Sequence, residues 1–167
     1  MKPRYKSRSV SVLLVVAFAA VYSLQAAPAP KQKLTAAAIQ VEQVDVGDIQ
    51  IPMEFRLAIY ENLLDRVRKS GKFQQVYRSG DHQAEGVKDL VTLRTKLQKF
   101  QEGSRTKREV TTVAGATKID VNTTVTAHDG QVLLDKNIEG KVRFFGENLG
   151  ATNDVAKRVT KILVNNF

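Results

Sequence analysis

Apolar residues recur with helical spacing near the start of the chain's folded part, and this pattern predicts a helix over residues 52–69. Apolar side chains return every fourth position from Phe55 to Val67, which places them on one face of a helix. Pro52 suits the first turn of a helix, and Gly71 suits the left-handed residue that follows the last turn. The helix is therefore expected to bury one stripe and expose the rest.

The end of the chain shows the same helical spacing. Val155, Val159 and Ile162 share one face of a predicted helix. Thr152 or Asn153 can cap the first turn, because both side chains accept hydrogen bonds from free main-chain N–H groups. We predict that this second helix begins at about Asn153.

Strands are predicted over residues 36–46, 73–77 and 89–100, where apolar and polar positions alternate. In the third strand, one face is apolar and consists of Val91, Leu93 and Leu97. The opposite face is polar and carries Arg94 and Lys96. This strand therefore predicts a sheet with one buried face and one wet, positive face.

A β-hairpin is predicted over residues 119–142, because Asp129-Gly130 is a typical two-residue turn between alternating segments. This turn sets the register, and only one register brings apolar residues opposite one another. On the core face the predicted partners are Ala127 with Val132, Val125 with Leu134, and Val121 with Ile138.

These elements predict an α+β domain with a mixed, largely antiparallel sheet of four to five strands. The predicted order is β-α-β-β-(β)-β-β-α, and both helices are expected to cover one face of the sheet because each has one apolar stripe. The bracketed strand would fall within residues 102–116, which are equally compatible with a loop.

The first 26 residues have the pattern of a secretory signal peptide. Four basic residues precede an uncharged, mostly apolar run over residues 10–24, and small residues follow it. This run is shorter than the about 20 apolar residues of a membrane-spanning helix, so we expect cleavage near Ala26 and no integral membrane span afterwards. The alternative is that the segment stays as an anchor. Residues 27–35 are predicted to be a linker rich in Pro, Ala and Lys, and residues 36–167 a single domain.

The signal peptide predicts a periplasmic or secreted protein. The chain contains no cysteine, so neither a lipid-modified cysteine nor a disulfide is expected. His82 and His128 are the only histidines, and both are interpreted as solvated loop residues. No cofactor or metal is predicted. No catalytic constellation is recognisable, so the chain is not expected to be an enzyme.

Positive charge is concentrated in one segment. The net charge is +9, and four of the cations belong to the predicted signal peptide. Residues 88–118 hold eight basic residues against three acidic ones, which accounts for the remaining excess of +5. The candidate contacts to an anionic partner in this segment are Arg94, Lys96, Arg105, Lys107 and Arg108. The alternative is a solvated strand face whose lysines protect the sheet from aggregation.

Short motifs in residues 89–136 resemble those of an uncharacterised domain, a domain of unknown function, found in envelope proteins of Gram-negative bacteria. The motifs are Asp89 to Leu93, Glu102-Gly103-Ser104 followed by Arg105, Ala114-Gly115-Ala116, and His128-Asp129-Gly130. The resemblance extends over roughly residues 36–164. Its plan is similar to the α/β domains of penicillin-binding-protein activator lipoproteins and of the curli secretion channel's periplasmic part. This resemblance implies an accessory or assembly role without catalysis, and it supplies no functional residues.

The favoured interpretation is a non-catalytic module that binds an envelope protein or an anionic envelope component. Nucleic acid is not an expected partner, because the protein is exported and its basic segment lacks interleaved aromatic residues. Two alternatives remain open. One is a hydrolase that acts on an envelope polymer through a carboxylate pair, and the other is a structural module that assembles with itself through a strand edge.

Overall fold

The structure, a computed structural model, describes residues 33–104, 106–107, 115–142 and 147–167. The predicted signal peptide, most of the linker and most of the 102–116 segment lie outside these residues. The described elements are β1 (Ala38–Val41), α1 (Met53–Lys69), β2 (Gln75–Arg78), a 3₁₀ turn (His82–Ala84), β3 (Leu90–Gln101), β4 (Thr117–Ala127), β5 (Val132–Val142) and α3 (Gly150–Asn166).

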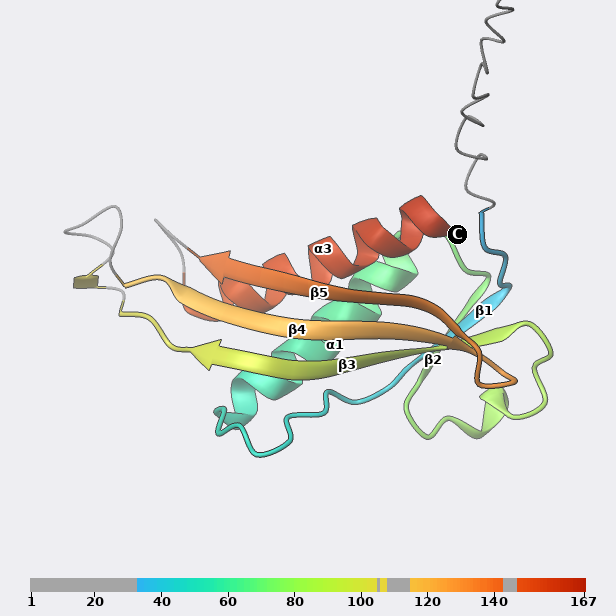
Figure 1. Cartoon of the computed structure of the whole chain (residues 1–167), viewed down its shortest axis with the longest axis horizontal. Helices are drawn as coiled ribbons and strands as arrows, with labels where there is room; N and C mark the ends of the chain where they lie inside the picture. Colours follow the sequence, from blue (N-terminus) through green and yellow to red (C-terminus); the bar gives the residue numbers. More distant parts are fainter. Residues whose placement is uncertain (1–32, 105, 108–114, 143–146) are drawn as a thin grey trace, which may run out of the picture. The chain divides into compact units, whose positions relative to one another are not determined.

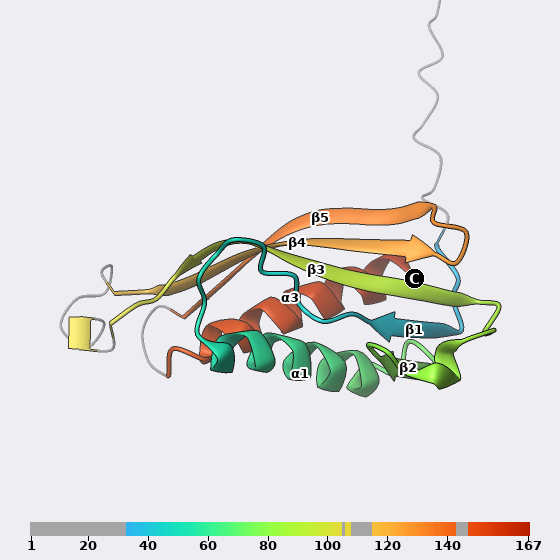
Figure 2. The ribbon, with the colours of Figure 1, turned by 90° about the horizontal axis from the view of Figure 1, so that it is seen from below.

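The five strands form one mixed sheet in the order β2-β1-β3-β4-β5 (Figure 1). Strand β1 runs parallel to both β2 and β3, whereas β3, β4 and β5 pair antiparallel. Both helices lie on the same side of the sheet, as Figure 2 shows. The predicted α+β fold with two helices on one face of a mixed sheet is confirmed.

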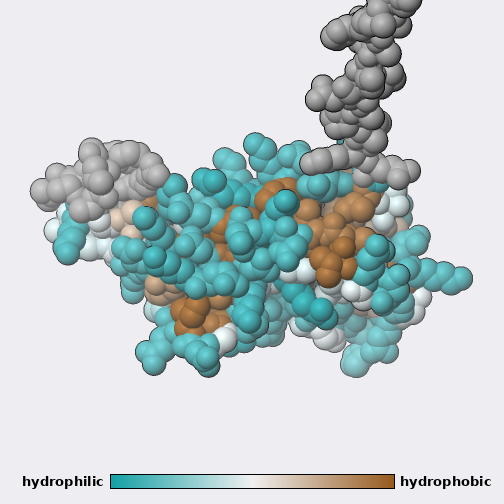
Figure 3. Space-filling model, viewed as in Figure 1, coloured by the Kyte–Doolittle hydropathy of each residue, from teal (hydrophilic) through white to brown (hydrophobic). Residues whose placement is uncertain are grey.

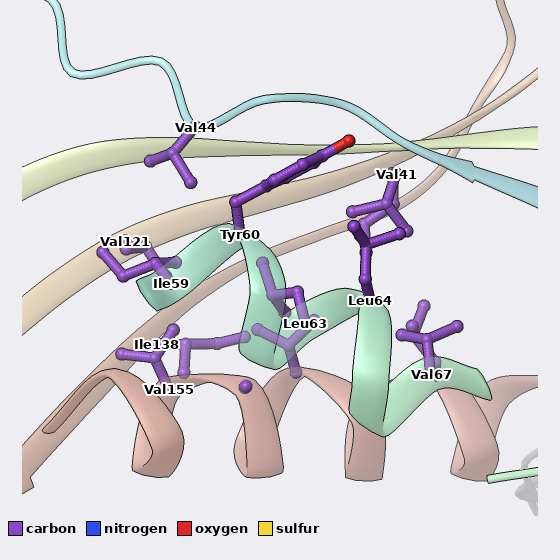
Figure 4. Close-up of a cluster of buried hydrophobic side chains, with 14 of the residues drawn as sticks. Val41, Val44, Ile59, Tyr60, Leu63, Leu64, Val67, Val121, Ile138 and Val155 are labelled. Carbon is purple, nitrogen blue, oxygen red and sulfur yellow. The ribbon is translucent and has the colours of Figure 1, made fainter. Parts of the chain in front are cut away.

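The core lies between this side of the sheet and the two helices (Figure 4). The predicted stripe of α1 is buried from Phe55 to Val67, and Val155 and Val159 of α3 are fully buried. The helix α1 ends as predicted, because Gly71 follows it with a φ of 61°. Phe100 of β3 packs edge-on against Phe55, with ring centroids 4.9 Å apart. The helical spacing therefore identified the core side of both helices.

The first strand is shorter than predicted. β1 ends at Val41, although Val44 further along remains buried. Beyond this break the chain still follows β3, since the Asp45 N–H donates to the Thr95 carbonyl at 3.0 Å and the Leu97 N–H donates to the Asp45 carbonyl at 2.7 Å. The break shifts the alternation, so that Val44 reaches the core from an irregular stretch.

The last helix begins at Gly150, about one turn earlier than predicted. Thr152 is fully buried, and its hydroxyl accepts a hydrogen bond from the Asn62 side chain of α1 at 2.9 Å. The Asn153 side chain accepts one from Arg66 of α1 at 2.8 Å. The predicted caps are wrong, because these two side chains fasten α3 to α1 instead of capping α3.

The hairpin register is confirmed along most of its length. Val121 lies opposite Ile138, and Val125 lies opposite Leu134, as predicted. The turn differs, because it contains three residues, 128–130, with Gly130 at a φ of 86°. The Gly130 N–H closes the turn by donating to the Ala127 carbonyl at 3.0 Å. A three-residue turn of this kind ends in a left-handed glycine and introduces a bulge.

This bulge corrects the predicted pairing nearest the turn. Val132 lies opposite Thr126 rather than Ala127, and the register shifts by one residue between Val125 and Thr126. Val132 is 56% exposed, although it was predicted to face the core. A shift of one residue moves a side chain to the other face of a strand, which explains the exposure.

Candidate functional site

The face of the sheet opposite the helices is solvated over β3 and β4, and we call this region the open face. Its central side chains are Thr92, Arg94 and Lys96 of β3 together with Asn122 and Thr124 of β4. Arg94 and Lys96 are both exposed, which confirms the predicted orientation of their strand. Most of the surface seen in Figure 3 is hydrophilic. The role of these cations as partner contacts stays a prediction.

The other three predicted contacts are not brought together with them by the described residues. Arg105 and Arg108 lie outside the residues that the structure describes. Lys107 is exposed, and its N–H lies 3.4 Å from the Ser104 hydroxyl, which accepts its hydrogen bond. Of the five predicted contacts, Arg94 and Lys96 are therefore the two that share one described surface.

The open face carries side chains of both charges. Arg94 and Lys96 lie opposite the neutral residues Thr124 and Asn122 of β4. Further along, beyond a bulge in β3, Lys99 lies opposite Asp120. Opposite charges on facing positions attract each other. Carboxylates also lie near the two central cations, because Asp45 pairs with Lys96 in an isolated bridge and Asp135 of β5 lies opposite Thr124. Arg94 and Lys96 are therefore exposed cations on a face of mixed charge.

The open face is bordered at one end by a groove of about 550 Å³, which we call the loop groove. Its walls are the segment 80–86 and the hairpin turn around His128, and Arg94 and Thr92 lie on the sheet side. A small buried cluster beside it, made of Ala38, Tyr77, Ala84 and Leu90, fastens the 80–86 segment to the sheet. The 80–86 wall of the loop groove is thus packed against the sheet. Arg94 belongs both to this groove and to the open face.

Both histidines of the chain line the loop groove. Each is exposed, in agreement with the interpretation of solvated loop residues, and the His82 Nδ1 lies 2.9 Å from a Glu85 carboxylate oxygen. Glu42 also lines the groove, and its carboxylate accepts a hydrogen bond from the Ser79 hydroxyl at 2.6 Å. The sequence interpretation treated the histidines separately. Strand topology explains why both histidines line one groove. His82 precedes β3 and His128 follows β4, and β3 begins where β4 ends because the two strands are antiparallel.

The polar and charged side chains of the open face and the loop groove suit the binding of a polar or charged partner. Across the residues that the structure describes, there is no cluster of three or more His, Cys, Asp or Glu side chains suited to holding a metal ion. Over the same residues, neither helix has the length and apolar character needed to cross a bilayer.

Two acidic residues occupy facing positions in the sheet, Asp120 of β4 and Glu139 of β5. Each has a cation beside it. Lys99 lies opposite Asp120 on β3, and the Lys141 ammonium forms an ion pair with Glu139. These contacts describe a charge-balanced surface, and the hydrolase alternative stays a prediction.

Comparison with known proteins relates this chain to others through its fold. No family model matches the sequence, and no curated protein matches it. The chain is similar in structure to PelC from Paraburkholderia phytofirmans, which was solved as a dodecamer. The TM-score is 0.58, the identity is 11%, and the match covers 80% of this chain and 92% of that one. A single-residue variant of the same dodecamer gives a TM-score of 0.54 and 12% identity, covering 77% and 87% of the two chains. At this identity the similarity concerns the fold alone.

Proposed function

We propose that this protein is an exported, non-catalytic binding module of the cell envelope, and that Arg94 and Lys96 contact an anionic envelope component or an acidic protein. The observation that carries the proposal is the pair of exposed cations on the sheet face opposite α1 and α3. A rigid strand holds the two side chains two residues apart on one face, which gives a partner a fixed pair of charges to recognise.

Export is the second part of the proposal. The basic and then apolar N-terminal pattern supports a periplasmic or secreted location, with cleavage near Ala26. Mass spectrometry of the protein recovered from outside the cytoplasm tests this directly. A new N-terminus within a few residues of Ala26 is expected, and an intact N-terminus would favour the retained anchor.

Crosslinking in intact envelopes tests the binding role. The wild-type protein is expected to recover a specific partner, and the double variant Arg94→Glu/Lys96→Glu is expected to lose it. The matched control is Lys88→Glu/Lys136→Glu, which makes the same change in charge at two other exposed lysines. A parallel variant reverses Arg105, Lys107 and Arg108. If both reversals leave envelope retention and its salt dependence unchanged, the basic segment is not a contact surface.

Self-assembly is a second candidate function. β2 and β5 are the two edges of the sheet, and an edge strand offers unpaired main-chain groups to another chain. The fold similarity to a PelC dodecamer supports this candidate. Light scattering over a range of protein concentrations tests it, and a monomer at every concentration would contradict it.

A further inference from the structure

A second basic surface lies on the helical side of the molecule, away from the open face. α1 and α3 lie side by side, and a groove of about 700 Å³ runs between their surfaces. Four cations line this interhelical groove: Arg66, Lys69, Lys157 and Lys161. The sequence interpretation missed it, because the four residues belong to segments almost 90 positions apart and neither lies in the 88–118 stretch.

Most of this charge is not neutralised by the protein itself. Among the described residues, Asp65 is the one acidic residue that lines the groove, and its carboxylate already binds Lys69 at 2.8 Å. Arg66 is held by the uncharged Asn153, so its position is fixed while its charge remains available. Lys157 and Lys161 are exposed and lie one turn apart on α3. Within the described part of the chain, neither of these two lysines is ion-paired.

The groove also has an apolar component. Val164 lines it and is 40% exposed, one turn beyond Lys161 on α3. The methylene stems of lysine and arginine can lie along such a surface while their charged ends reach outward. The groove therefore combines one exposed valine with cations from both helices, a pairing suited to the headgroup region of a lipid surface.

The chain enters the domain at the same end of α3. The Leu34 N–H donates to the Asn166 carbonyl at 2.8 Å, so the predicted linker ends beside the last turn of this helix. The 32 residues before the described part include the apolar run that is expected to pass through or stay in a membrane. The end of α3 that carries Lys161 and Val164 is thus the part of the domain to which this segment is joined.

We propose that the interhelical groove docks on the phosphate headgroups of an anionic phospholipid bilayer. Lysine binds phosphate as a point charge, and arginine adds a planar pair of donors. Cations near an anionic surface each contribute to binding, and together four of them give a salt-sensitive, reversible attachment. A bilayer is favoured over an acidic protein because the groove is an open surface that carries several cations and little negative charge. If the N-terminal segment is retained as an anchor, it also joins the domain at the same end of α3.

Vesicle sedimentation with the exported protein tests this proposal. The probes are vesicles of phosphatidylcholine alone and vesicles with about one third phosphatidylglycerol. The wild type is expected to bind the anionic vesicles at least about tenfold more tightly. The variant Lys157→Glu/Lys161→Glu is expected to lose this difference, and Lys157→Arg/Lys161→Arg is expected to keep it. Raising the salt concentration should weaken the binding of the wild type.

The matched control is Lys88→Glu/Lys136→Glu, which changes the net charge equally at two exposed lysines outside the interhelical groove. It is expected to bind anionic vesicles within about twofold of the wild type. Equal loss in both double variants would overturn the proposal in favour of unspecific charge attraction. Failure to bind anionic vesicles, or capture of an acidic peptide in place of vesicles, would overturn it too. None of these results bears on the partner of the open face, which the envelope crosslinking tests separately. Circular dichroism verifies that each variant is folded.

Discussion

The two faces of β3 share one backbone and have opposite surroundings. Leu93 is fully buried beneath the helices, whereas the adjacent Arg94 is exposed on the open face. The apolar side chains on the buried face stabilise the protein because folding removes their surface from water, whereas the exposed charged side chains contribute little to stability. Substitutions on the open face can therefore change binding without unfolding the protein, whereas removing a large apolar side chain from the core face lowers its stability.

The largest expected effect is on the core face. Leu93→Ala removes a side chain with no exposed surface and leaves a cavity, which should lower the free energy of unfolding by about 2–5 kcal/mol. The neighbouring Arg94→Ala is the matched control and should change it by no more than about 0.5 kcal/mol. Urea unfolding followed by circular dichroism measures both. Similar losses in the two variants would mean that the open face is covered.

A smaller loss is expected where α3 approaches β5. A Cβ added at Gly140 would lie 2.3 Å from Val155 Cγ2 and 2.8 Å from the Ala151 carbonyl oxygen. Gly140→Ala should therefore cost about 1–3 kcal/mol, because the helix must shift away from the sheet. Glu139→Ala, on the opposite face of the same strand, is the control. A Gly140→Ala protein as stable as the wild type would show that α3 moves away from β5 at little cost.

Periodicity was sufficient to predict which faces are buried. Alternation along β3 and the four-residue spacing in α1 depend on each element's own geometry, and both predictions are confirmed. Errors arose where a residue has two possible roles. Thr152 is a good cap in isolation, but a contact with Asn62 from a distant segment uses its hydroxyl. The turn after Ala127 similarly admits two lengths, and the longer one places Val132 outside the core.

The candidate site was predictable only in part, for the same reason. Exposure of Arg94 and Lys96 follows from alternation within one strand. The loop groove requires that residues 80–86 and the hairpin turn meet at one end of the sheet, which depends on strand order. The interhelical groove requires the pairing of α1 with α3. Sequence periodicity contains no information on which helix lies beside which.

A gain in stability is expected from replacing two polar residues that are buried on the core face of the sheet. Thr95 and Thr123 lie opposite each other on the core side, and each has a buried hydroxyl that has no hydrogen-bond partner within the described residues. Burying an unpaired hydroxyl costs free energy, so Thr95→Val/Thr123→Val should stabilise the protein by about 1–2 kcal/mol. Thermal unfolding measures this gain. A loss would mean that the hydroxyls are hydrogen-bonded in solution.

The smallest effect is expected at an exposed ion pair between α1 and β2. Arg78 donates to both carboxylate oxygens of Glu61, and this hydrogen bonding lowers the pKa of Glu61 below its usual 4.5. Because the pKa of this carboxyl is lower in the folded than in the unfolded protein, its ionised form stabilises the fold at pH values above the unfolded-state pKa. This stabilisation is lost as the pH falls through the folded-state pKa. Glu61→Gln should therefore slightly lower the melting temperature at neutral pH, and the difference should vanish well below pH 4.5. Since the pair is exposed, added salt should reduce the difference as well. A difference that persists in acid would mean that Glu61 acts through packing, as the core face does, rather than through charge.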